Sequence, residues 1–194
     1  MERQKYPGIC YYEQIDGKTV EITAEIPYEI PESWCWCRLG TITNIVMGQS
    51  PDGASVKNEG PGIEFHQGKI FFGEQYLRPS PQRTTRPTRI APAGSILICV
   101  RAPVGVVNIT AREICIGRGL AAVMALCNIS EMFVAHWITA RQQALVKEAT
   151  GSTFLAVSAD QVKNLFIPLP PQQEQTRILG TISQHESILK SLRG

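Results

Sequence analysis

A strand, a corner and a helix follow one another in the segment Ile167-Pro168-Leu169-Pro170-Pro171-Gln172-Gln173-Glu174-Gln175-Thr176-Arg177-Ile178. Pro171 suits the first helical turn, because the N–H group that proline lacks would have no partner there. Glu174 follows near the same helix N-terminus, where its negative charge meets the helix dipole favourably. The segment therefore predicts a strand over 165–167, a rigid corner, and a helix from Gln172 to the end of the chain.

One face of this C-terminal helix carries residues that step by four, three, four and three. These residues are Ile178, Ile182, His185, Leu189 and Leu192. Such steps are coiled-coil spacing, here over about two heptads. They favour an arm that projects from the globular body and pairs with another helix. The alternative is a lone amphipathic helix that packs back on its own domain.

The middle of the chain is typical of β-structure. Apolar runs bounded by glycines, such as Ser95–Val100 after Gly94, predict buried strands. The expected strands cover 95–100, 104–109, 114–116 and 120–126. Residues 49–93 are instead rich in Gly, Pro, Ser and Thr, with short strand candidates at 65, 70–72 and 76–77. So long an irregular region is expected to be either functional or disordered.

The N-terminal third is expected to contain three short elements. The turn pair Asp16-Gly17 lies between apolar residues and predicts a hairpin. Trp34–Cys37 alternates tryptophan with cysteine, as a strand with one aromatic face does. Leu39–Val46 is predicted to form a short helix that stops before Gly48.

Two helices are expected between the β-structure and the proline corner. Asn128 with Glu131 three residues later resembles a capping pair, so a helix should begin there and end at Gly151. Ser158 and Gln161 have the same spacing and predict a second, short helix.

The size and composition of the chain fit one domain with an appendage. With 194 residues, 43% of them hydrophobic, the chain can bury a real core. No apolar run approaches the ~20 residues of a membrane span, and the polar N-terminus shows no signal peptide, so a cytoplasmic protein is expected. The six cysteines are expected to be free and mostly buried. Cys35-Trp36-Cys37 is the one close pair, and its spacing is too short for a structural zinc site.

Recognisable catalytic motifs are missing from the sequence. A DNA adenine methyltransferase needs an Asn/Asp-Pro-Pro-aromatic corner, whereas the one Pro-Pro pair lies in Leu169-Pro170-Pro171-Gln172. The glycines of Ile116-Gly117-Arg118-Gly119 precede strand-like sequence rather than a phosphate-binding helix. His66, His136 and His185 are far apart. We therefore expect a non-enzymatic chain with no catalytic residue, no cofactor and no metal.

Charge is segregated along the chain although the net charge is only +2. The stretch Gln75–Arg112 contains no Asp or Glu and six arginines, while the first 32 residues hold seven acidic residues. A local basic field is what a polyanion needs, and arginine can clamp phosphate or read guanine in a bidentate way. The alternative is a solvated loop whose arginines only keep it soluble.

Five segments in order resemble one target recognition domain from the specificity (S) subunit of type I restriction-modification systems. The likeness covers roughly residues 26–192. The segments are Ile30–Gly40, Gly94–Ile98, Arg101–Gly105, Ile116–Leu120 and, at the end, Gly151–Phe154 with Ile167–Ile178.

The resemblance implies a mixed, β-rich α+β recognition domain over 30–170. Residues 1–29 would be a linker with a hairpin, and residues 171–194 would begin a projecting spacer helix. It also implies that the chain selects double-stranded DNA for methyltransferase (M) subunits and a restriction (R) subunit, which supply all the chemistry. The C-terminal helix would set the distance to a second recognition domain or to a homodimer partner.

Charge and loop placement, rather than the resemblance, select the residues expected to contact DNA. They are Arg78, Arg83, Arg86, Arg89, Lys69, Lys57 and Gln49. The alternative function is a non-catalytic protein-interaction scaffold that uses the helical arm.

Overall fold

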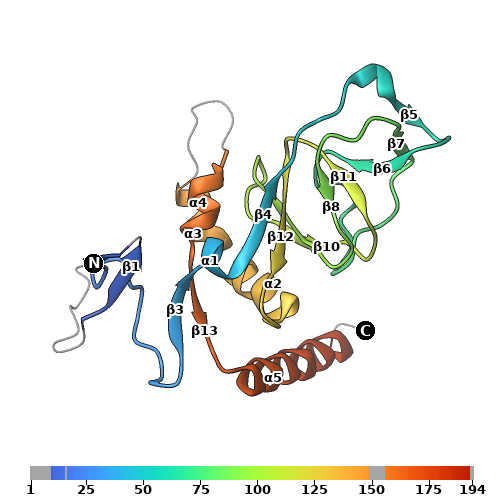
Figure 1. The fold of residues 1–194 in the computed structure, drawn as a ribbon. Coiled ribbons are helices and arrows are strands. Elements are labelled where there is room, and N and C mark those ends of the chain that lie inside the picture. The colour runs from blue at the N-terminus through green and yellow to red at the C-terminus, as the bar shows by residue number, and fades with distance from the viewer. Residues whose placement is uncertain (1–9, 16, 149–155, 193–194) are drawn as a thin grey trace.

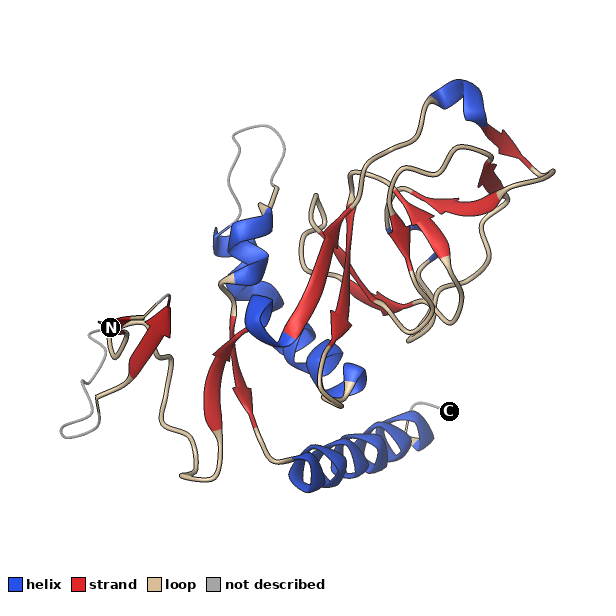
Figure 2. Cartoon of the chain, in the orientation of Figure 1, coloured by secondary structure: helices blue, strands red, loops and turns tan. Residues whose placement is uncertain are grey.

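Helices and strands are mixed along the chain in the computed structural model, which describes residues 10–15, 17–148 and 156–192 (Figures 1 and 2). The predicted fold class, mixed and β-rich α+β with a long C-terminal helix, is confirmed. Three predicted features lie outside the described residues: the Gly151–Phe154 motif, the helix end at Gly151, and Asp16 of the hairpin turn.

The apolar run at Ile96–Cys99 forms strand β9 inside a four-stranded antiparallel sheet. The strand order is β10-β9-β12-β4 (Figure 1). The neighbours are β10 (Val107–Ile109), β12 (Leu120–Ala125) and β4 (Thr43–Met47). The strands predicted around β9, β10 and β12 are confirmed, although each is shorter than expected.

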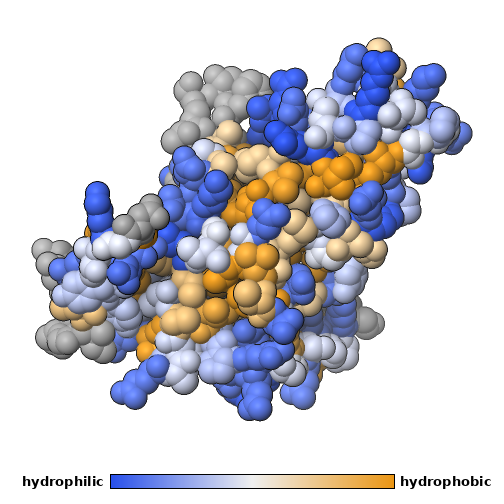
Figure 3. All heavy atoms as spheres, in the orientation of Figure 1, coloured by the Kyte–Doolittle hydropathy of each residue, from blue (hydrophilic) through white to orange (hydrophobic). Residues whose placement is uncertain are grey.

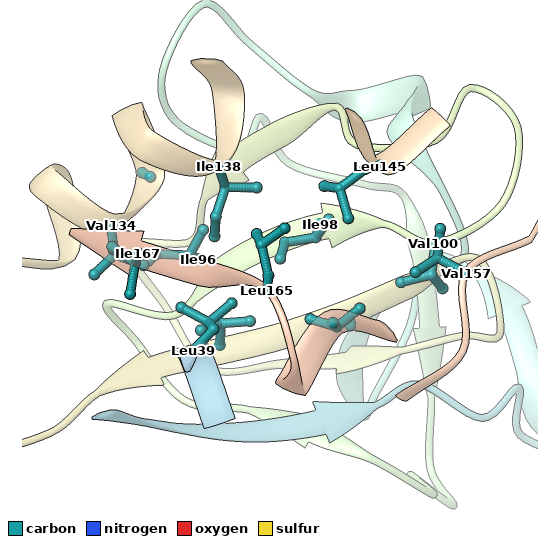
Figure 4. Close-up of a cluster of buried hydrophobic side chains, with 14 of the residues drawn as sticks. Leu39, Ile96, Ile98, Val100, Val134, Ile138, Leu145, Val157, Leu165 and Ile167 are labelled. Atoms are coloured by element: carbon teal, nitrogen blue, oxygen red, sulfur yellow. The ribbon is translucent and has the colours of Figure 1, made fainter. Parts of the chain in front are cut away.

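Both faces of strand β9 are buried, which explains why its sequence shows no polar alternation. Successive side chains of a strand point to opposite faces. Ile96, Ile98 and Val100 pack into the core under the helices (Figure 4). Leu97 and Cys99 pack into a second core on the other side of the sheet. The molecule is therefore layered, with helices, the four-stranded sheet and a second sheet in succession.

The second sheet has the strand order β5-β7-β6-β11-β8. Its strands are β5 (Val56–Asn58), β7 (Gln82–Thr84), β6 (Ile63–His66), β11 (Ile114–Ile116) and β8 (Ile90–Ala91). Four of them come from residues 49–93, so the prediction that this region is mainly irregular is wrong, while the strand candidate at residue 65 is confirmed by β6. Strands β5, β7 and β8 were missed because strands of two or three residues carry too little periodicity to be read from sequence. The strand expected at 70–72 is wrong as well, because Lys69–Phe71 forms a 3-10 turn.

The helical layer contains α1 (Leu39–Ile42), α2 (Glu131–Ala140), α3 (Gln142–Glu148) and α4 (Ala159–Lys163). The predicted helix over 39–46 ends early, because from Thr43 the chain pairs with β12. The capping box of Ser158 and Gln161 at α4 is confirmed. Asn128 is not the cap of α2. It has a φ of 60°, a left-handed turn conformation, and Ser130 caps the helix by accepting a hydrogen bond from the Phe133 N–H.

The proline corner joins β13 (Phe166–Leu169) to α5 (Gln172–Ser191). Strand β13 pairs with β3 (Cys35–Arg38), which confirms the strand predicted at Trp34–Cys37. Pro171 is the N-cap of α5, one residue before the turn expected for it. The side chain of Gln175 is buried at the corner, where its Nε2 donates to the Pro170 carbonyl at 3.0 Å. Its Oε1 accepts from the Ser130 N–H at 3.0 Å, so one amide joins α5 to the start of α2.

Replacing Gln175 with alanine is expected to lower the free energy of unfolding by about 1–3 kcal/mol, because two backbone groups lose their hydrogen-bond partner in a buried place. Urea unfolding followed by circular dichroism measures this. Gln173→Ala is the matched control, since Gln173 is exposed on the same helical turn. Equal midpoints for the two variants would contradict the role of Gln175.

Helix α5 runs beside α2 rather than straight away from the body (Figure 1). Ile178 and Leu179 are half-buried against the core, and Lys190 forms an ion pair with Glu74 at 2.7 Å. The apolar residues of its last turns are nevertheless more than half exposed: Ile188, Leu189 and Leu192. Both expectations for this helix hold in part, because it contacts its own domain and also leaves an apolar edge uncovered. Its pairing with another helix stays a prediction.

A hairpin of β1 (Tyr12–Ile15) and β2 (Lys18–Glu21) precedes the domain, as predicted. Arg38 connects it to the body. The Arg38 Nε donates to both Glu13 oxygens at 2.7 and 2.8 Å, and Nη2 donates to Glu25 at 3.2 Å. The same guanidinium lies 4.4 Å from the centre of the Phe166 ring. The division of the chain at residues 29 and 170 stays a prediction.

All six cysteines are free, as expected. The expectation that most are buried is wrong, because Cys10, Cys35 and Cys127 are exposed and Cys37 is half-buried. Within residues 10–15, 17–148 and 156–192 no three His, Cys, Asp or Glu side chains are grouped as metal ligands would be. No helix in the same residues has the length and apolar character to cross a membrane.

Candidate nucleic-acid interface

Three of the residues expected to contact DNA come together at the outer edge of the second sheet. Lys57 on β5 lies directly opposite Arg83 on β7, and Arg86 follows in the next turn. Their side chains line a pocket of about 270 Å³. Figure 3 shows hydrophilic residues gathered at this end of the molecule, at the upper right.

Like charges on directly opposite strand positions destabilise a sheet. On the opposite side of β7 from Lys57, the residue paired with Arg83 is Glu64 on β6. The Glu64 carboxylate forms an ion pair with Arg112 and is therefore not free to neutralise Arg83. The Arg83 Nε donates to the Gly62 carbonyl at 2.9 Å, which fixes the side chain without neutralising it. Asp52 also lines the pocket, but its single negative charge does not balance the three positive charges of Lys57, Arg83 and Arg86. The arrangement favours an anion bound from outside.

The other predicted residues lie on neighbouring segments. Arg78 and Lys69 flank one turn, where the Arg78 Nη2 donates to the Phe72 carbonyl at 3.3 Å. Gln49 and Arg89 lie on either side of Ile116: the Gln49 N–H donates to the Ile116 carbonyl, and the Ile116 N–H donates to the Arg89 carbonyl.

All these side chains are exposed except Arg83, which is half-buried. Across the described ranges, none of the six cations expected to contact DNA lies within ion-pair distance of a carboxylate. Arg83 was expected in a loop and lies instead on a strand, where the paired backbone holds its position more firmly.

Arg112, at the end of the acid-free stretch, has a different role from the other arginines. Its Nε and Nη2 donate to the two oxygens of Glu64 at 2.6 and 2.5 Å, and its Nη1 donates to the Leu77 carbonyl at 3.1 Å. His66 Nε2 lies 2.7 Å from the same carboxylate, and the Ser80 N–H donates to it, also at 2.7 Å. Glu64 is only 9% exposed, so this cluster is part of the architecture of the second sheet.

The cluster shifts the pKa values of its members. Burial raises the pKa of Glu64, but the hydrogen bonds from Arg112, Ser80 and His66 outweigh burial and hold the pKa at about 2. Burial lowers the pKa of His66, and Glu64 opposes that shift only in part. Glu64 is therefore charged and His66 neutral near neutral pH. The sequence offered no signal for this cluster, because Arg112 lies 48 residues from Glu64 and Ser80 lies 16 residues from it.

Comparison with known proteins identifies the class to which this fold belongs. Residues 31–193 match the family described as type I restriction modification DNA specificity domain. The chain belongs to this family.

Similar proteins and solved structures come from type I restriction-modification systems as well. A Methanocaldococcus jannaschii protein named as the MjaX type I restriction enzyme specificity subunit is 36% identical over 168 residues, 85% of this chain and 39% of that protein. The crystal structure of the HsdS subunit from Thermoanaerobacter tengcongensis matches with a TM-score of 0.77 and 35% identity, over 86% of this chain and 40% of that one. A chain solved in work on complex assembly and conformational transition of the type I R-M system matches with a TM-score of 0.78 and 36% identity, over 86% of this chain and 41% of that one. The chain thus spans about 40% of the length of these relatives.

Proposed function

We propose that this chain recognises a DNA duplex for a type I restriction-modification complex and catalyses nothing itself. The observation that carries the proposal is the unneutralised pair Lys57 and Arg83 on adjacent strands, joined by Arg86. Phosphate oxygens are the natural partners of such a group, because arginine and lysine bind them through charge-assisted hydrogen bonds. Phosphate contacts fix the register of a protein on the duplex, and base-edge contacts then supply specificity.

The rest of the complex would supply the chemistry. Methyltransferase subunits and a restriction subunit are the expected partners, as the assembly named for one matching structure supports. The exposed apolar edge of α5, formed by Ile188, Leu189 and Leu192, supports docking of a second recognition domain or of a second copy of this chain. The pairing would hold two recognition domains at a fixed distance on the DNA.

Salt dependence tests the proposal and separates it from a pure protein-interaction scaffold. Binding to a duplex through the three clustered cations should give a log–log slope of affinity against salt concentration of about −3 or steeper. The complex is purified through a tag on this chain. The fluorescence anisotropy of a labelled duplex, titrated with the complex between about 50 and 300 mM salt, then gives the slope. A flat response, or no binding to any duplex, would favour the scaffold.

A further inference from the structure

Three loops meet in direct backbone contact on the edge where β4 and β6 end and β12 begins. We call residues 48–50, 67–68 and 117–119 the three-loop surface. The Gly48 N–H donates to the Leu120 carbonyl at 2.9 Å, and the Gly117 N–H donates to the His66 carbonyl at 2.8 Å. The Arg118 N–H contacts the Ser50 hydroxyl at 3.5 Å. The turn that carries Arg118 therefore lies between the other two loops.

Close approach, rather than backbone conformation, requires glycine in these loops. A Cβ atom on Gly48 would lie 2.1 Å from the Gly117 carbonyl oxygen, and one on Gly119 would lie 2.3 Å from the Gln67 carbonyl oxygen. Neither glycine has a positive φ, so another residue would be excluded by space alone. Backbones packed this tightly hold the intervening side chains at fixed positions.

The side chains that this rigid surface displays are Gln49, Gln67 and Arg118. All three are exposed. Neither the two glutamine amides nor the Arg118 guanidinium forms a hydrogen bond or ion pair with another described residue. Gln49 also connects the surface to the cationic edge, because its carbonyl accepts a hydrogen bond from the Thr88 hydroxyl, two residues beyond Arg86.

The chemistry of these groups divides their roles. A glutamine amide carries no net charge and presents one donor and one acceptor side by side, which matches the N6 and N7 positions of adenine in the major groove. Arg118 carries a full charge that suits a phosphate. We infer that Gln49 and Gln67 read base edges, and that Arg118 between them binds a backbone phosphate and fixes their register. This inference rests on the proposed DNA-binding function.

Selection from a pool of random duplexes tests the inference, with the complex captured through a tag on this chain. The wild type should enrich a defined motif. Gln49→Ala and Gln67→Ala should each lose preference at one or two positions of that motif, by roughly 5- to 150-fold, because a bidentate base contact is worth about 1–3 kcal/mol. Their salt slopes should match the wild type. Arg118→Ala should weaken binding to all duplexes alike and reduce the salt slope by about 1.

The control is Gln173→Ala, an exposed glutamine on α5. Thermal unfolding of every variant shows whether its fold is retained. Glutamine variants that fold and still enrich the full motif would overturn the inference and leave DNA recognition standing. A wild-type complex that binds no duplex, or binds without any preferred motif, would instead overturn the proposed function.

Discussion

Replacing Glu64 with alanine is expected to lower the free energy of unfolding by about 2–4 kcal/mol, because its partner Arg112 is partly hydrated. The substitution removes the carboxylate that accepts hydrogen bonds from Arg112, from the Ser80 N–H and from His66. The loss comes mainly from the buried Ser80 N–H, which is left without an acceptor, while the Arg112 guanidinium is 34% exposed and regains part of its hydration. The variant should also loosen the second sheet, which carries Arg83 opposite Glu64.

Chemical denaturation followed by tryptophan fluorescence measures the change. Glu113→Ala is the matched control, because Glu113 is exposed, lies next to Arg112 in sequence and takes no part in the cluster. Glu64→Gln should fall between the wild type and the alanine variant, since the amide keeps one acceptor but loses the charge. A loss below about 1 kcal/mol for Glu64→Ala, the range of an exposed ion pair, would show that the cluster is not structural.

The same cluster makes stability depend on pH. The pKa of Glu64 is lowered from 4.5 to about 2 in the folded state, so the stability it contributes is complete above pH 4.5 and is lost as the pH falls toward 2. The pKa of His66 is also lowered by folding, so acidification below its ordinary value of 6.5 favours the unfolded chain as well. Protonation of either group therefore destabilises the fold in acid. In a plot of the free energy of unfolding against pH, Glu64→Gln should reduce the slope on the acidic side.

Removing the three clustered cations together is expected to reduce the salt slope of DNA binding by about 3, one for each phosphate contact. Affinity near physiological salt should fall on the order of a thousandfold or more for the triple variant Lys57→Ala, Arg83→Ala, Arg86→Ala, since each charge-assisted hydrogen bond contributes about 1.5–3 kcal/mol. Stability should change little, because the loss of the bond from Arg83 to the Gly62 carbonyl is offset by relief of repulsion between Lys57 and Arg83.

Anisotropy titrations at several salt concentrations measure both effects. The control is a triple variant that removes the same amount of charge elsewhere: Lys18→Ala, Lys147→Ala and Lys163→Ala. These lysines are exposed and distant in sequence from the pocket. The control should keep most of the affinity and the slope. A test variant that stays folded and keeps the wild-type slope would show that the cations are not phosphate ligands, and one that unfolds would show that they are architectural.

The sequence predicted the elements whose signals are local. The capping box of Ser158 and Gln161 spans four residues and predicts the start of α4. The apolar run of β9 predicts a strand that is buried on both faces. Strands β5 and β7 carry no such signal, because their polar residues are held by pairing with distant segments. The start of α2 was misplaced by two residues, because Asn128 and Ser130 are equally good caps until the turn conformation is known.

The candidate site was predictable in its charge and not in its geometry. Spacing of three to five residues identified Arg83 and Arg86, but only the strand register places Lys57 opposite Arg83. Arg112 belongs to the same basic stretch, and only its contact with Glu64 separates it from the exposed arginines. Charge counts cannot distinguish a neutralised arginine from a free one, because the partner lies far away along the chain.

The attachment of the hairpin through Arg38 has a consequence for anyone who trims this protein. The family match begins at residue 31, so a shortened chain cut at that boundary would discard both Glu13 and Glu25. The Arg38 guanidinium, only 16% exposed, would then lie over the Phe166 ring without a counter-charge, beside the strand pair from which α5 departs. Fragments intended for crystallisation or binding assays should therefore begin no later than residue 10.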